Sequence, residues 1–162
     1  MNMTPEACQF SMNLLLQQQA ELTRQLSAML DREYAAVTAR DFEAFEQVIQ
    51  EKSLTVEQLD LLERERIALL ESAGYSEEPD AMGSFLAWCD PGQSLTPQWE
   101  QLLALAGTCR DHNRRNHQLI ELCNRHTRET LRILRGEEAQ PELYQPDGET
   151  DSGHGNRPLA RA

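Results

Sequence analysis

Two Cys-x-x-His pairs are the residues of this sequence whose spacing most clearly suits chemistry. Cys109 with His112 and Cys123 with His126 each place a thiol and an imidazole on one face of a predicted helix, as zinc ligands often are. The pairs lie 14 residues apart in that helix, about 21 Å at 1.5 Å per residue, so they cannot share one ion within one chain. We interpret them as structural thiols and surface histidines, and predict no metal site and no cofactor.

The signatures of common catalytic sites are missing from the sequence. It has no Gly-rich phosphate loop, no Gly-x-Ser-x-Gly elbow and none of the Glu-x-x-His repeats of di-iron bundles. We therefore predict that the protein is not an enzyme. A metal-dependent bundle enzyme is the weakest alternative, and stoichiometric metal in the purified protein would be needed to support it.

Asn113 and Asn116 lie in the middle of a stripe whose steps alternate between three and four residues, the pattern of a helix that packs on other helices. The stripe consists of Trp99, Leu102, Ala106, Cys109, Asn113, Asn116, Ile120, Cys123, Thr127, Thr130 and Leu134. Two interpretations stay open. The amides can fix the register of packed helices, or they can face a groove that binds a partner helix or strand. The neighbouring Arg114 and Arg115 slightly favour the groove.

Helix-forming residues dominate the chain, and only 6 % of its residues are aromatic. We predict an all-α, antiparallel bundle of three long helices at about 5–38, 41–73 and 97–135, with helix starts at Thr4-Pro5 and Asp41 and ends at Gly74 and Gly136. One continuous helix of about 70 residues is the alternative to the first hairpin, and it would need a partner chain.

Two stretches differ from these helices. The connector, residues 74–96, is rich in Pro and Gly but can hold a short helix around Phe85 and Trp88. Residues 137–162 predict a flexible, disordered acidic tail after a bundle domain at 1–136. Tyr144 in this tail is either random composition or the anchor of a short docking motif.

Charge and composition exclude several classes of protein. The net charge of −12 disfavours generic binding to nucleic acid. No apolar run reaches the roughly 20 residues of a membrane span, and we see no signal peptide. The four Cys are scattered, as in reduced cytoplasmic proteins. Residues 5–73 hold 13 acids and 6 bases, whereas residues 110–135 hold 3 acids and 7 Arg, so the basic helix faces either the acidic hairpin or an acidic partner.

An ordered set of spaced residues runs through the chain between about residues 15 and 150. The set consists of Glu33, Arg40-Asp41-Phe42, Lys52, Arg64-Glu65-Arg66, Leu69-Leu70, Trp99, Leu102, Asn113-x-x-Asn116, Leu119-Ile120, Tyr144 and Asp147-Gly148. In this order it resembles the FlgN-type flagellar export chaperones. His117 departs from the family pattern, which often has Gly after the second Asn.

The resemblance implies a cytosolic chaperone of flagellar type III protein export. Its clients would be the hook–filament junction proteins FlgK and FlgL, held by their C-terminal helical segments and kept from premature assembly. By position, Asn113, Asn116, Ile120 and Cys123 would bind the client, and Tyr144 would dock on the cytoplasmic domain of the export-gate protein FlhA. We expect a monomer, although a homo-oligomer is possible. The alternative function is that of a self-associating structural coiled-coil protein without a client.

Overall fold

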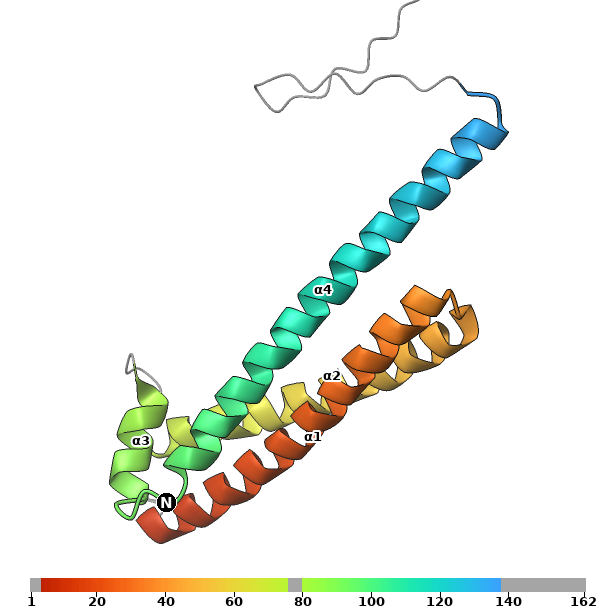
Figure 1. Ribbon diagram of the computed structural model, residues 1–162. Coiled ribbons are helices and arrows are strands. Elements are labelled where there is room, and N and C mark those ends of the chain that lie inside the picture. Colours follow the sequence, from red (N-terminus) through yellow and green to blue (C-terminus); the bar gives the residue numbers. More distant parts are fainter. Residues whose placement is uncertain (1–3, 76–79, 138–162) are drawn as a thin grey trace, which may run out of the picture. The chain divides into compact units, whose positions relative to one another are not determined.

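The computed structural model describes residues 4–75 and 80–137. Its helices are α1 (Pro5–Ala39), α2 (Phe42–Ser72), α3 (Ala81–Cys89) and α4 (Thr96–Leu134). The all-α class and the short connector helix are confirmed, and the described residues include no strand (Figure 1). No helix in these residues is long and apolar enough to cross a membrane. Most of the expected tail, 138–162, lies outside the described residues.

Helices α1 and α2 form an antiparallel hairpin because local residues stop the first helix and start the second. Thr4 caps α1 by accepting a hydrogen bond from the Ala7 N–H at 3.3 Å. Arg40 ends the helix in the left-handed conformation, with φ of 56°. The Asp41 side chain then caps α2 by accepting from the Ala44 N–H at 3.0 Å. The chain therefore turns back at Arg40, and the single 70-residue helix does not form.

The connector between α2 and α4 is fastened to the start of α1 through Asp90, which is 1 % exposed. Its carboxylate accepts hydrogen bonds from the Leu95 N–H at 2.6 Å, Ser94 Oγ at 2.9 Å and Gln9 Nε2 at 2.8 Å. These three bonds fix the loop from which α4 begins.

The apolar core lies where the start of α1, the end of α2, α3 and the start of α4 meet. Its buried members are Cys8, Met12, Leu15, Leu16, Ala20, Leu69, Leu70, Met82, Phe85, Leu86, Cys89, Leu95 and Leu102. Phe85 is fully buried, and its ring meets the Tyr75 ring edge-on at 5.9 Å. Burying a side chain of this size contributes roughly 1.5–3 kcal/mol, so this end of the hairpin holds most of the hydrophobic stabilisation.

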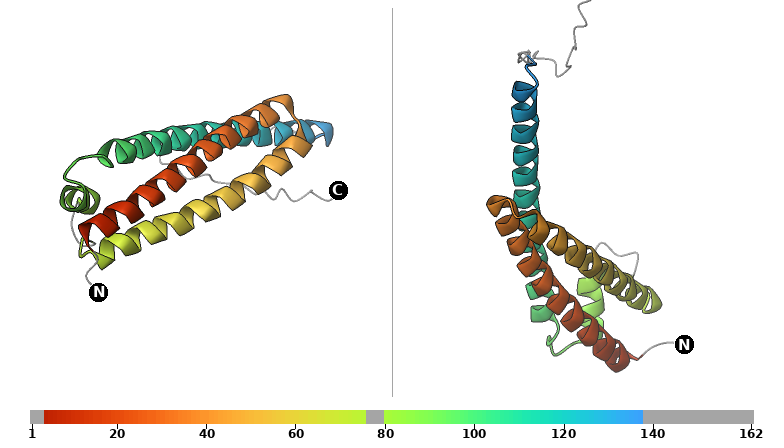
Figure 2. Two further views of the ribbon diagram at one scale, coloured as in Figure 1. Left: turned by 90° about the horizontal axis from the view of Figure 1, so that it is seen from below. Right: turned by 90° about the vertical axis from the view of Figure 1, so that its right-hand side faces the viewer.

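The chain forms two compact units, Met1–Cys123 and Asn124–Ala162, and α4 contributes to both. Within the first unit α4 runs parallel to α1, because residues about 85 positions apart meet along their length. These pairs are Asn13 with Gln98, Thr23 with Cys109 and Leu30 with Asn116. Figure 2 shows this arrangement beside the antiparallel α2.

Within the first unit, the inner face of α4 differs from the predicted stripe at two positions. Ala106 and Asn113 are exposed, whereas Leu105 and His112 are half-buried towards the hairpin. Leu102, Cys109 and Asn116 are buried as the stripe predicts. Leu105 and His112 lie about 100° around the helix from Ala106 and Asn113, so the face of α4 that meets the hairpin is the one that contains Leu105 and His112. The stripe residues of the second unit, Thr127, Thr130 and Leu134, are all exposed.

Candidate functional site

A buried carboxylate joins the three long helices. Glu33 of α1 is 2 % exposed, and its Oε1 accepts a hydrogen bond from Lys52 Nζ of α2 at 2.6 Å. Its Oε2 accepts from Asn116 Nδ2 of α4 at 2.8 Å. We call Glu33, Lys52 and Asn116 the polar node. Because each helix supplies one member, the node fixes the register of all three helices at once.

Asn116 itself is 1 % exposed and fully engaged with α1. Besides Glu33, its amide N–H₂ donates to the Leu30 carbonyl at 2.7 Å. A buried amide that lost both acceptors would be left without hydrogen bonds in an apolar setting, which costs about 1–3 kcal/mol. The geometry therefore gives Asn116 a structural role in holding α4 on the hairpin.

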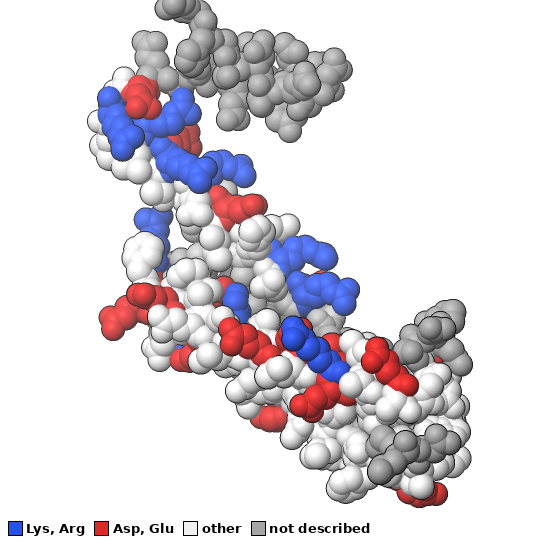
Figure 3. Space-filling view, turned by 180° about the vertical axis from the view of Figure 1, so that it is seen from behind, with Lys and Arg blue, Asp and Glu red and all other residues white. Residues whose placement is uncertain are grey.

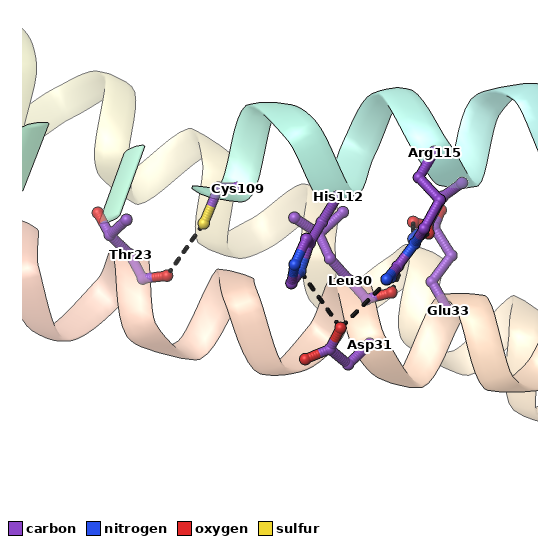
Figure 4. A network of polar contacts seen from close by, with 8 residues as sticks. Thr23, Leu30, Asp31, Glu33, Cys109, His112 and Arg115 are labelled. Carbon is purple, nitrogen blue, oxygen red and sulfur yellow. Dashed lines mark hydrogen bonds and ion pairs between the residues drawn. The ribbon is translucent and has the colours of Figure 1, made fainter. Parts of the chain in front are cut away.

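A second set of polar contacts surrounds the node on α4. His112 Nδ1 lies 3.2 Å from Asp31 Oδ1, and Arg115 Nη2 donates to the same oxygen at 3.3 Å. The Arg115 guanidinium also lies 4.1 Å from the centre of the Tyr34 ring, a cation–π distance. Figure 4 shows these side chains reaching from α4 to α1. Between Cys109 and Asn116, α4 is thus attached to the hairpin largely by polar contacts.

The thiols in this region are reduced and mostly buried. Cys8, Cys89 and Cys109 are buried, whereas Cys123 is half-buried. Burial, with smaller contributions from nearby Cys8 and Asp90, raises the pKa of Cys89 to about 11. Burial also raises the pKa of Cys109, whose thiol donates to the Thr23 carbonyl at 3.5 Å. These thiols are poor nucleophiles, since the thiolate is the reactive form.

The two Cys-x-x-His pairs do not form a metal site in the part of the chain that the structure describes. No three His, Cys, Asp or Glu side chains there are placed to hold an ion. In the first pair, Cys109 contacts the Thr23 carbonyl and His112 contacts Asp31, both on α1.

The residues predicted to bind a client occupy different environments. Asn113 is exposed, Asn116 is buried, and Ile120 and Cys123 are half-buried beside the hairpin. The two amides therefore do not form one hydrogen-bonding pair. His117, the departure from the family pattern, is exposed and lies 3.3 Å from Glu121. Tyr144 lies outside the described residues.

Apolar side chains are exposed near the end of α4. Leu122 is 57 % exposed in the first unit. In the second unit, taken by itself, Leu131, Ile133 and Leu134 are 45 %, 70 % and 77 % exposed. Arginines alternate with them along the helix, and Figure 3 shows basic side chains gathered along α4 and acidic ones over the hairpin. An exposed surface of this kind is typical of a binding site for another protein.

The sequence matches one family model, described as FlgN protein, over residues 10–152. The chain belongs to the FlgN family. FlgN proteins are chaperones of flagellum assembly and export, which agrees with the all-helical structure and the exposed apolar residues on α4. No curated protein and no solved structure matches the chain.

Sequence reasoning missed the joint role of Glu33 and Lys52, although both belong to the FlgN-like pattern. The available signal was Glu33 itself, which lies three residues after Leu30 and three before Ala36 in an otherwise apolar stripe. A charged residue in such a position must find a partner when it is buried. Which residues would supply that partner depended on contacts between distant parts of the chain.

Proposed function

We propose that this FlgN-family protein is a cytoplasmic chaperone for hook–filament junction proteins of the FlgK and FlgL type. It binds their C-terminal helical segments, prevents premature assembly and delivers them to the cytoplasmic domain of FlhA. The observation that carries the proposal is the exposed apolar surface of α4 beside a polar attachment to the hairpin. The family match supports a chaperone of flagellar export in general.

The chemistry of such a client explains why a surface of mixed polarity suits the task. A segment that assembles as a helical bundle covers its apolar face only after assembly, so it needs a substitute partner before export. An amphipathic helix laid beside another helix provides one. Polar groups at the site limit affinity and add specificity, because a wrong partner leaves them without hydrogen bonds.

We assign client contact to one side of α4. Asn113 lies at its exposed edge, and Ile120 and Cys123 continue it about two and three turns further along the helix. Asn116 lies beneath this side and holds α4 against Leu30 and Glu33. It takes part by positioning the helix, and touches a client directly only when α4 leaves α1.

Calorimetric titration of the C-terminal segments of junction proteins into the full chain tests the proposal, with light scattering on the same samples. We expect saturable binding of one client segment per chain. Asn113→Ala should weaken binding by up to about tenfold, because one net hydrogen bond is worth about 0.5–1.5 kcal/mol. Gln118→Ala is the matched control, since Gln118 is exposed on the other side of α4. No binding of either segment would overturn the proposal and favour the structural coiled-coil protein.

A further inference from the structure

A groove between α1 and α2 exposes apolar side chains that nothing in the first unit covers. Its floor consists of Leu14, Leu22, Leu61 and Leu62, and its volume is about 570 Å³. Leu14 is 48 % and Leu61 58 % exposed. The polar rim consists of Gln17, Gln18, Glu21, Gln58 and Glu65. Exposed leucines gathered between two helices are a typical docking surface for a third helix.

This groove lies on the side of the hairpin that faces away from α4. At 100° per residue, Thr23 and Leu30, which contact α4, lie about 160–180° around the α1 axis from Leu14. The first unit therefore packs α4 on one face of the hairpin and leaves the other face open. A helix placed there would complete a four-helix arrangement.

The end of α4 has the matching character. Leu122 and Ile133 lie eleven residues apart, which places them within about 20° of each other on one stripe of the helix. Arg125 and Arg132 lie together on one flank of this stripe, about 60–80° from Leu122. The stripe is about 16 Å long, and the groove from Leu14 to Leu22 is about 12 Å long.

We propose that the groove receives residues 122–134 of a second copy of this chain. Charge supports this occupant: residues 5–73 carry 13 acids and 6 bases, and residues 110–135 carry 7 Arg and 3 acids. Among the described residues, Glu65 at the rim has no ion-pair partner, and neither do Arg125 and Arg132. Glu21 on the opposite wall forms a surface ion pair with Arg24 at 3.3 Å and accepts a hydrogen bond from Gln25 Nε2 at 3.1 Å.

Each copy offers one groove and one basic helix end. Two copies that exchange these surfaces around a two-fold axis bury both pairs and leave neither free for further growth. We expect this closed exchange, a dimer, in place of an open head-to-tail chain. Each of its two interfaces brings Leu122 and Ile133 against the leucines of the groove and Arg125 and Arg132 against its acidic rim. Glu129 lies on the same stripe, about 20° from Leu122.

Reciprocal charge reversal tests this dimer in the absence of any client. One variant carries Glu21→Arg and Glu65→Arg, and the other carries Arg125→Glu and Arg132→Glu. By light scattering at low ionic strength, we expect the unaltered chain at twice the monomer mass. Each variant alone should associate roughly tenfold or more weakly, because like charges then meet at both interfaces. An equimolar mixture of the two variants should recover the dimer, since each interface regains opposite charges.

Two further variants separate this site from general effects of charge and folding. Glu46→Arg makes the same charge change on α2 about 28 Å from Glu65 and should leave the dimer intact. Leu61→Ser should weaken the dimer but leave the helical content of the chain unchanged, because Leu61 is largely exposed within one copy. A monomeric unaltered chain, or a mixture that stays monomeric, would overturn the proposal. Loss of client binding in the Leu61→Ser variant, with a monomeric parent, would assign the groove to the client instead.

Discussion

At the scale of single residues, Asn113 and Asn116 lie only three positions apart on α4 but have different roles. Asn116 donates to Leu30 and Glu33 from inside the bundle, whereas Asn113 is exposed at its edge. The carboxylate of Glu33 depends on Asn116 and Lys52 together, since a buried charge must be paired and hydrogen-bonded to be tolerated. Asn116 therefore holds in place the helix on which Asn113 is exposed.

Substituting Asn113 and substituting Asn116 should have different effects on the free energy of unfolding. We expect Asn116→Ala to lower the free energy of unfolding by about 1–3 kcal/mol, because Glu33 and Leu30 lose a buried donor. Asn113→Ala should change it by less than about 0.5 kcal/mol, as exposed substitutions usually do. Urea unfolding followed by circular dichroism measures both, and the helical content of the folded variants should match the parent. Equal effects of the two substitutions would contradict the structural role of Asn116.

At the scale of elements, the connector depends on Asp90 as much as the bundle depends on Glu33. Burial alone would raise the pKa of Asp90, but the hydrogen bonds from Leu95, Ser94 and Gln9 outweigh it and leave the pKa lowered. A carboxyl whose pKa is lower in the folded than in the unfolded chain stabilises the fold above its unfolded pKa. That contribution is lost as the pH falls through its folded pKa.

Asp90→Asn should therefore change the acid end of the stability profile. We expect the variant to be less stable than the parent at pH 7, by about 1–3 kcal/mol, since an amide replaces a carboxylate that accepts three hydrogen bonds. The difference should begin to shrink below about pH 4, where Asp90 of the unfolded parent takes up a proton, and should be lost once the pH passes the lower folded pKa. Thermal unfolding between pH 2 and pH 7 measures it. Asp80→Asn is a useful control, because Asp80 is exposed and caps only α3.

The elements themselves could be predicted from the sequence because their boundaries are set locally. The boundaries are set by Thr4, by Asp41 and by the turn at Arg40, each of which contacts residues within about four positions. Local signals of this kind can be recognised from the sequence alone. The inner face of α4 was harder, since Leu105 and Ala106 are both apolar and only packing chooses between them. The polar node could not be predicted, because its members lie 19 and 83 positions apart.

At the scale of the whole molecule, the proposed function divides client binding and gate docking between two parts of the chain. The first belongs to α4, and the second to Tyr144 in the segment after the described residues. We base the second assignment on the resemblance of this segment to the FlgN pattern. The division implies that one function can be lost without the other.

Tyr144→Ala should separate the two functions. We expect calorimetric binding of the client segment to stay unchanged, since we assign client contact to α4. Binding of the chaperone–client complex to the FlhA cytoplasmic domain, and export of the client, should both fall. Gln145→Ala provides a neighbouring control with the gate interaction retained. Abolished client binding in Tyr144→Ala would contradict the division.

The uneven distribution of apolar residues has a further consequence for how the hairpin fluctuates. The core of Phe85 and its neighbours lies at the end where α3 meets the bundle, while the polar node lies towards the turn at Arg40. Hydrogen bonds and ion pairs can exchange with water at little net cost, whereas an apolar core cannot. The free energy of local opening should thus fall along the hairpin from α3 towards the turn. The end of the hairpin near Arg40 can therefore open locally while the end that holds the apolar core stays folded.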